Sequence, residues 1–179
     1  MSIKKQILKN NIVLVTEPIA TSKTVAIGFW FSVGSRYEAE NQSGITHFVE
    51  HMIFKGTPNR TAYEIACSFD RIGGYVNAFT ERELVCLHCV VPAQYAEFAL
   101  EILTDMTHNA LFLEQDVNKE RSVIESEIIS AQDDPEEACL DTVIDCVFPE
   151  NPLSKNICGT LDTVKNLSPT DLKNWYIKY

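Results

Sequence analysis

The sequence predicts an α+β fold in which helices pack on one face of a mainly antiparallel sheet. Segments typical of strands and segments typical of helices are grouped along the chain, and they do not alternate strictly. Two turn sequences, Asn10-Asn11 and Glu81-Arg82, each separate a pair of strand-like segments. The 179 residues fit a single domain, 1–179. We expect this domain to be truncated at its C-terminus, because the sequence stops at Tyr179, inside or just after a helix, with no strand to follow.

Three strands are expected before the first helix. The segments Lys4–Leu8 and Ile12–Glu17 form a hairpin at Asn10-Asn11, a residue pair that tolerates the positive φ of a tight turn. Thr24–Val33 is a mostly apolar third strand that ends at Gly34-Ser35.

Glycines and caps delimit the elements that follow. A helix of about Gly44–Phe54 is closed by Gly56-Thr57-Pro58, and the next helix stops at Gly73-Gly74. Near the end, Ser168-Pro169-Thr170-Asp171 opens a helix with a serine cap, a proline at the first helical position and an acid that closes a capping box. The other expected elements are helices of about Ala62–Ile72, Ala93–Ala110, Glu114–Ala131 and Pro135–Val147, and the hairpin strands Tyr75–Thr80 and Leu84–Val91.

The composition restricts the possible partners and the location. Apolar residues make up 45% and charged residues 22% of the chain, which is ordinary for a soluble globular protein. The net charge of -10 argues against nucleic acid as a partner, because phosphate binding needs a basic face. The sequence shows neither a signal peptide nor a run of ~20 apolar residues, so we expect a cytoplasmic protein with no membrane span. The stretch Cys86-Leu87-His88-Cys89 lacks the second Cys or His pair that a structural zinc site needs.

The expected helix Gly44–Phe54 carries the candidate chemistry. His47 and His51 are four residues apart, so they lie one above the other on one helix face, and Glu50 flanks that face about 60° away. Two imidazoles one turn apart can both bind one zinc ion at ~2.0–2.1 Å. The carboxylate then stands beside the metal without ligating it, where it can hold a water molecule. This residue order is the inverted zinc-peptidase motif, H-x-x-E-H.

The alternative is a core helix with two hydrogen-bonded histidines and no metal. The helix is apolar nearly all round, so it is expected to be buried. Burying two histidines and a carboxylate on one sector costs several kcal/mol unless they are paired or bind a metal. The pattern therefore favours a metal site. The surrounding apolar residues are Ile45, Phe48, Val49, Met52, Ile53 and Phe54.

A catalytic zinc needs a third protein ligand and an open fourth position. Glu127 and Glu120 lie about 20° apart in the middle of the apolar stripe of the expected helix Glu114–Ala131, where an unpaired charge is not tolerated. Glu127 is therefore the predicted third ligand. Glu120 is predicted to accept a hydrogen bond from a ligating histidine and so fix its tautomer. The alternative is an ion pair of these carboxylates with Arg121 or Lys119, which lie off the stripe. The predicted stripe consists of Leu113, Val117, Val123, Ile124, Ile128 and Ala131.

With these residues the sequence resembles the insulinase/pitrilysin family of zinc peptidases, which includes the mitochondrial processing peptidases and their bacterial relatives. The separation of His51 and Glu127, 127 − 51 = 76 residues, fits the position of the family's third ligand. The resemblance extends over nearly the whole chain and rests on three stretches: Gly44-x-x-His47-Phe-x-Glu50-His51-Met-x-Phe54-Lys-Gly56-Thr57, Gly73-Gly-x-x-Asn77-Ala78-x-Thr80-x-x-Glu83 and Glu120-Arg-x-Val123-Ile124-x-x-Glu127.

The resemblance implies a water-activated peptidase. A Zn2+ ion held by His47, His51 and Glu127 would polarise the water and the scissile carbonyl, and Glu50 would take the water's proton and hand it to the leaving amine. The resemblance also implies that a peptide or unfolded polypeptide substrate adds as a strand to the edge formed by Asn77, Ala78, Phe79 and Thr80. Family members pair such a domain with a similar one that closes over the substrate, so a companion homologous domain or subunit is expected.

Two classes of function follow from this reading. The leading hypothesis is a zinc-dependent endopeptidase domain. The alternative is a catalytically silent partner or scaffold subunit of a processing-peptidase assembly, a kind of protein that the family also contains. A catalytically silent subunit does not need a buried charged site. This chain has all of the residues of such a site, His47, Glu50, His51 and Glu127, which argues against the alternative. A combination of the two is a chain that binds zinc but turns over little substrate without its companion.

Overall fold

The computed structural model describes residues 3–179 and confirms a mixed fold of helices and antiparallel strands. Every predicted helix and strand is present among these residues, with ends that differ by a few residues from the predicted ones. The strands are β1 Lys4–Ile7, β2 Val13–Thr16, β3 Thr24–Phe31, β4 Tyr75–Thr80 and β5 Val85–Pro92. The helices are α1 Ile45–Ile53, α2 Ala62–Arg71, α3 Ala96–Asn109, α4 Glu114–Asp133, α5 Pro135–Val147, α6 Leu161–Asn166 and α7 Pro169–Lys178.

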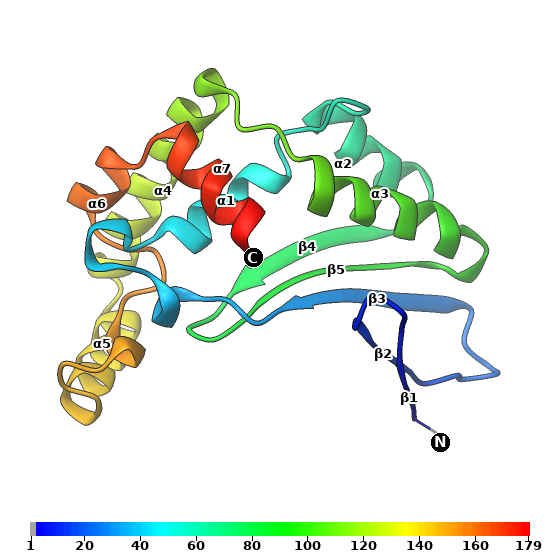
Figure 1. Cartoon of the computed structure of the whole chain (residues 1–179), viewed down its shortest axis with the longest axis horizontal. Coiled ribbons are helices and arrows are strands. Elements are labelled where there is room, and N and C mark those ends of the chain that lie inside the picture. The colour runs from blue at the N-terminus through cyan, green and yellow to red at the C-terminus, as the bar shows by residue number, and fades with distance from the viewer. Residues whose placement is uncertain (1–2) are drawn as a thin grey trace.

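The main sheet has three antiparallel strands in the order β3-β5-β4. Side chains alternate between its two faces, because successive residues of a strand point in opposite directions. Val85, Leu87, Cys89 and Val91 of β5 are buried on one face, and helices α1, α2 and α3 cover that face (Figure 1). This is the predicted arrangement, in which helices pack on one side of an antiparallel sheet.

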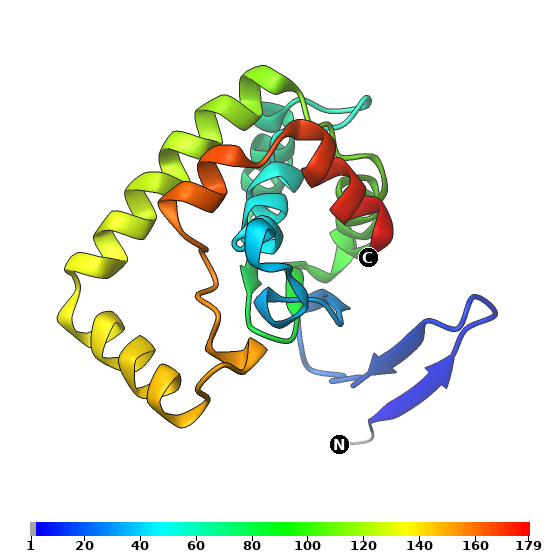
Figure 2. The ribbon, with the colours of Figure 1, turned by 60° about the vertical axis from the view of Figure 1, so that its left-hand side comes forward.

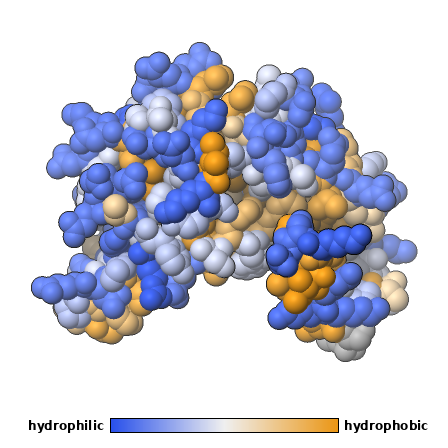
Figure 3. Space-filling view, viewed as in Figure 1, coloured by the Kyte–Doolittle hydropathy of each residue, from blue (hydrophilic) through white to orange (hydrophobic). Residues whose placement is uncertain are grey.

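The predicted N-terminal hairpin forms, but it stands apart from the main sheet. Strands β1 and β2 pair only with each other, and the hairpin projects from the body of the protein on the side away from the helices (Figure 1). Ile7, Val13 and Val15 lie on one face of the hairpin and are more than half exposed, at 67%, 51% and 59%. Figure 3 shows apolar side chains at the surface of this part of the molecule.

Helix α1 lies between two hydrophobic cores. One core joins α1 to α4, α6 and α7 and includes Phe48, Ile124 and Leu172. The other joins α1 to α2, α3 and the sheet and includes Ile53 and Leu87. The side chain of Val49 packs against both cores. The position of α1 is therefore fixed from two sides.

The start of α1 is held by a buried carboxylate. Glu38 is 3% exposed and accepts hydrogen bonds from the backbone N–H groups of Gly44 and Thr46 at 2.8 and 2.9 Å. The first N–H groups of a helix have no partner within it, and the N-cap residue Gly44 has no side chain to accept from them. The carboxylate of Glu38 serves as the cap instead. Gly44 has φ 90°, and a Cβ at this position would lie 2.5 Å from the carbonyl oxygen of Cys158. The segment around Cys158 therefore packs directly against the start of α1.

Helix α4 differs from the predicted stripe in its packing. Val117, Ile124 and Ile128 are buried as predicted, but Leu113 and Val123 are 45% and 43% exposed. The prediction was wrong for these two residues. The face of α4 that packs against α1 and α6 is narrower than the predicted apolar stripe, so residues at the margins of that stripe remain exposed. Helix α6, which the sequence did not predict, covers part of the buried stripe of α4.

Helix α5 is the least buried of the long helices. It turns back sharply from the end of α4, and the segment that follows it returns along the body of the protein to α6 (Figure 2). The helix has no buried residue. Arg82, in the turn between β4 and β5, donates hydrogen bonds to Asp141 of α5 at 3.2 Å and to the carbonyl oxygen of Leu153 at 2.9 Å. These contacts tie α5 to the end of the main sheet.

Within residues 3–179, no helix combines the length and the apolar character that crossing a bilayer requires.

The two cysteines of the stretch Cys86–Cys89 do not face each other. Cys86 and Cys89 both lie on β5, three residues apart, and therefore project to opposite faces of the sheet. They do not form a metal knuckle.

Candidate metal centre

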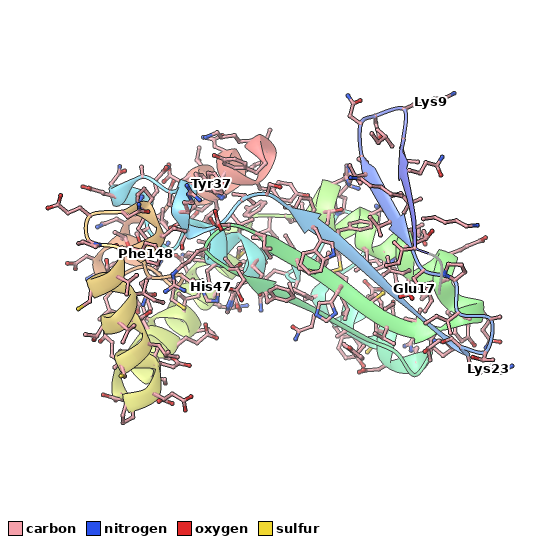
Figure 4. The ribbon with its side chains drawn as sticks, turned by 90° about the horizontal axis from the view of Figure 1, so that it is seen from below. Lys9, Glu17, Lys23, Tyr37, His47 and Phe148 are labelled. Atoms are coloured by element: carbon pink, nitrogen blue, oxygen red, sulfur yellow. The ribbon has the colours of Figure 1, made fainter. Side chains whose placement is uncertain are left out.

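The structure brings the three predicted ligands together at one point. His47 and His51 project from α1 toward Glu127 of α4, and the potential ligand atoms of the three residues all lie within 4.8 Å of one another. Figure 4 shows His47 between the main sheet and α5. The histidine side chains are mostly buried, 14% and 17% exposed, whereas the side chain of Glu127 is 44% exposed. The group is therefore open to solvent on the side of α4.

The separations of these atoms fit a tetrahedral zinc ion. The Nε2 atoms of His47 and His51 are 3.3 Å apart. Oε2 of Glu127 lies 3.4 Å from Nε2 of His51 and 3.8 Å from Nε2 of His47. Ligand atoms at ~2.0–2.1 Å from a tetrahedral zinc ion are roughly 3.3–3.4 Å apart. Two of the three separations have this value and the third is slightly longer, so the donor set matches the metal.

The hydrogen bond of His51 determines which of its atoms is free for a metal. Nδ1 of His51 lies 3.2 Å from Oε2 of Glu120, and a carboxylate can only accept, so the ring donates its proton there. The other ring nitrogen, Nε2, faces the carboxylate of Glu127, and in the neutral ring it carries a lone pair. Two electron-rich atoms at this distance need a cation or a proton between them. This contact is the one predicted for Glu120.

His47 lies in an environment that keeps its ring neutral. Burial, and to a lesser extent the neighbouring His51, lower the pKa of His47 from 6.5 to about 4. A neutral imidazole is the form that binds a metal ion. The Nδ1 atom of His47 is buried and has no hydrogen-bond partner within residues 3–179. The two histidines therefore differ, because only the ring of His51 is held by a hydrogen bond at Nδ1.

Glu120 is paired, but with a cation that the sequence prediction did not include. Lys55 Nζ lies 2.6 Å from Oε1 of Glu120. The two cations that were considered are engaged elsewhere: Arg121 donates to the carbonyl oxygens of Val164 and Leu167, and Lys119 lies 3.9 Å from Asp116. A signal for Lys55 was available, since it follows His51 by four residues and so continues the same helix face.

Glu50 stands beside the three ligands and contacts β4. The hydroxyl of Thr80 donates a hydrogen bond to Oε2 of Glu50 at 2.5 Å. Burial raises the pKa of Glu50, while the Thr80 hydrogen bond and the nearby His51 oppose that rise. A carboxyl group whose pKa is moved toward neutrality suits the exchange of protons with a reacting group.

A cleft of about 500 Å³ opens next to His47 and Glu50. Ala78, Phe79 and Thr80 line it, together with His47 and Glu50. Three of the four predicted substrate-binding residues therefore face the candidate site. The opposite wall is formed by α5 and the segment after it, with the lining residues Glu137, Leu140, Asp141, Ile144, Asn156, Ile157 and Cys158.

Asn77, the fourth predicted substrate-binding residue, contacts the edge of the strand instead of the cleft. Strand β4 is an edge of the main sheet, because it pairs with β5 on one side and with no other strand among residues 3–179. The side-chain oxygen of Asn77 accepts a hydrogen bond from the backbone N–H of Ala78 at 2.9 Å. One donor of the open edge is thereby covered by a local side chain, which protects an exposed edge from unwanted pairing.

Comparison with known proteins identifies the family of this chain. Residues 13–161 match the sequence profile of the family described as Insulinase (Peptidase family M16). The chain is 38% identical to the uncharacterized zinc protease YmxG of Bacillus subtilis over 99% of its own length and 43% of that protein. It is 37% identical to a probable mitochondrial-processing peptidase subunit beta of Arabidopsis thaliana over 96% of its own length and 32% of that protein.

Solved structures share the fold. A protease from Helicobacter pylori superposes with a TM-score of 0.91 at 24% identity, over 98% of this chain and 42% of that one. A peptidase M16 inactive domain from Pseudomonas fluorescens superposes with a TM-score of 0.90 at 11% identity, over 98% of this chain and 43% of that one. The chain thus spans less than half the length of these relatives. It belongs to the insulinase family of peptidases, family M16.

Proposed function

We propose that this chain is the metal-binding part of a zinc-dependent endopeptidase, with His47, His51 and Glu127 as zinc ligands and Glu50 as the general base of an inverted H-x-x-E-H motif. One observation carries the proposal. Three potential ligand atoms from two helices converge at separations that suit tetrahedral zinc, beside a carboxyl group that does not join them. The names of relatives that are zinc proteases support the choice of metal.

The protein's own residues would perform the proton transfers. When bound, zinc acidifies water and polarises a carbonyl group as a Lewis acid. Glu50 would accept the proton of the attacking water and return it to the leaving amine. Its hydrogen bond with Thr80 aims the carboxyl group from α1 toward the cleft, where Ala78 and Phe79 form the wall. Glu120 would hold the ring of His51 by its Nδ1 atom.

The substrate would be a peptide or an unfolded polypeptide bound as an added strand. The open edge of β4 runs beside the cleft, so a peptide paired with this edge would pass in front of Glu50. Main-chain pairing depends little on the substrate sequence. To pair with Ala78, the substrate carbonyl oxygen would have to displace the side chain of Asn77.

A silent partner or scaffold subunit is the alternative. The fold does not decide between the two functions, because an inactive domain shares it. The residue set favours the peptidase, because both histidines and Glu127 converge, and Glu50 lines the adjoining cleft together with His47. We also propose that this chain needs a companion domain or subunit for efficient turnover, since the proteins that it resembles are more than twice as long.

Metal content and peptidase activity measured together test the proposal. The purified chain is expected to hold one zinc ion, and the His51→Ala variant is expected to lose it. A chain extended to the length of the relatives should cleave a quenched peptide, and its Glu50→Gln variant should keep zinc and lose the cleavage. Stoichiometric zinc in His51→Ala would refute the site. An extended chain that binds zinc without any cleavage would identify the silent partner instead.

A further inference from the structure

Lys55 lies at the end of a chain of contacts that leads to the candidate metal site. Its Nζ atom is 2.6 Å from Oε1 of Glu120, and the other carboxylate oxygen, Oε2, is 3.2 Å from Nδ1 of His51. Nε2 of His51, on the opposite side of the ring, faces Glu127 at 3.4 Å. A cation, a carboxylate and an imidazole are therefore connected in one line.

The backbone places Lys55 firmly. The residue follows the last turn of α1, where its N–H donates to the carbonyl oxygen of Met52 at 3.0 Å. Its side chain is 30% exposed, so the ammonium group lies at the rim, whereas the side chain of Glu120 is 11% exposed. The contact thus connects the end of α1, which carries the two histidines, to α4.

Glu120 requires such a cation. It lies on the face of α4 that carries the buried residues Val117 and Ile124, where an uncompensated carboxylate is unfavourable. Within residues 3–179, the groups that contact its oxygens are His51 and Lys55. The adjacent Arg121 is turned away to two backbone carbonyls, so it does not compensate Glu120.

We infer that Lys55 is a positioning residue of the metal centre: its ammonium group holds one oxygen of Glu120 so that the other oxygen fixes the ring of His51 with Nε2 toward Glu127. The inference rests on the proposed function, because it assumes that His51 binds the metal. It assigns to Lys55 a role beyond compensating a buried charge, since the ion pair determines the direction in which a ligand points.

Zinc affinity and the absorption spectrum of bound cobalt test this role. The probes are Zn2+ in competition with a chromophoric chelator and Co2+, whose visible absorption reports the geometry of its ligands. We expect Lys55→Met to weaken zinc binding by about 10-fold, the lower end of the effect of losing a partner of a metal ligand, and to change the cobalt spectrum. Lys119→Met is the matched control, because Lys119 is a 74% exposed lysine of α4 paired at 3.9 Å.

A double-mutant cycle separates positioning from general destabilisation. In a Glu120→Gln background the substitution Lys55→Met should cause no further loss of zinc affinity, because the carboxylate through which Lys55 acts is gone. This double variant also leaves no buried charge unpaired, so it provides a folded sample if Lys55→Met alone does not fold.

The outcomes distinguish the two proposals. Zinc binding by the unmodified chain with unchanged affinity in Lys55→Met would overturn the role of Lys55 alone. Equal losses from Lys55→Met in the presence and absence of Glu120 would overturn it as well, since the effect would not pass through that carboxylate. A chain that binds no zinc at all would overturn the proposed function and this inference together.

Discussion

Thr80 of the edge strand β4 donates a hydrogen bond to the carboxyl group of Glu50 on α1. The contact joins the strand proposed to bind the substrate to the residue proposed to move the proton. Because the bond stabilises the ionised carboxyl group, it limits the rise in the pKa of Glu50 that burial causes. A peptide that moved Thr80 on binding to the strand would therefore change the pKa of Glu50 as well.

Removing the hydroxyl of Thr80 should raise the pKa of Glu50 further. In Thr80→Val the shape of the side chain is nearly kept, but the interaction that lowers the pKa is lost. A ¹³C NMR titration of the Glu50 carboxyl carbon in the metal-free chain would show the change. Thr80→Ser, which keeps a hydroxyl, is the control and should titrate like the unmodified chain. An unshifted titration in Thr80→Val would show that the bond does not matter in solution.

The metal-free protein should lose stability as the pH falls from about 6.5 to about 4. The folded pKa of His47, about 4, is below its ordinary value of 6.5, so in this range the unfolded chain binds a proton that the folded chain does not. The loss attributable to this histidine would reach about 3 kcal/mol at the acid end. Urea unfolding at a series of pH values measures it, and in His47→Leu that part of the pH dependence should disappear. An identical pH dependence in both proteins would contradict the buried, neutral state.

Zinc should stabilise the chain through the three converging residues. A ligand that binds only the folded state at 1,000 times its dissociation constant adds about 4 kcal/mol, so the midpoint of thermal unfolding should rise when zinc is added. The rise should be absent in His51→Ala and in Glu127→Ala. His108→Ala, at an exposed histidine outside the site, should keep it. A rise of equal size in all variants would indicate binding elsewhere.

Arg82→Ala should loosen α5 without affecting the rest of the fold. This helix has no buried residue, and Arg82 connects it to the end of the main sheet through Asp141. Hydrogen exchange of the α5 amides should become faster, while exchange in α4 stays the same. Arg36→Ala removes an exposed ion pair with Glu83 and serves as the control. Unchanged exchange in α5 would mean that the packing of this helix on α4 holds it in place without the contact to Arg82.

Two glycines with similar backbone angles should respond differently to alanine. Gly44 and Gly73 have φ values of 90° and 68°, so both substitutions introduce backbone strain of the order of 1 kcal/mol. At Gly44 the new Cβ would also lie 2.5 Å from the carbonyl oxygen of Cys158, whereas at Gly73 it would meet no atom within 4 Å. Urea unfolding should therefore show a clearly larger loss for Gly44→Ala. Equal losses would mean that the segment around Cys158 moves away from the new Cβ without a measurable loss of stability.

The sequence was sufficient for most of the helices and strands and for the common face of the two histidines, because these follow from short-range patterns. The four-residue spacing of His47 and His51 fixes their common face whatever surrounds the helix. The position of Glu120 was predictable for a related reason, since a carboxylate in an apolar stripe requires a polar partner. The exposure of Val123 was not predictable, because it depends on where α6 crosses α4, which is a tertiary relationship.

The pairing of Glu120 with Lys55 could not be derived from α4 alone. The partner is neither of the cations of the same helix, which formed the alternative to a role at the metal; it comes from the end of α1, 65 residues earlier (120 − 55 = 65). Likewise, the contact of Arg82 with α5 joins elements whose relative placement no local pattern encodes. The roles of the site residues themselves remain predictions that the experiments above address.

The location of α1 between two hydrophobic cores has a consequence for the release of a bound ion. The two imidazoles are carried by one rigid segment, so the distance between them changes little as the protein fluctuates. Glu127 is 44% exposed and belongs to α4, which packs on only one of the two cores. Departure of the ion would therefore begin with the carboxylate, and a chelator in solution would reach it from the side of α4.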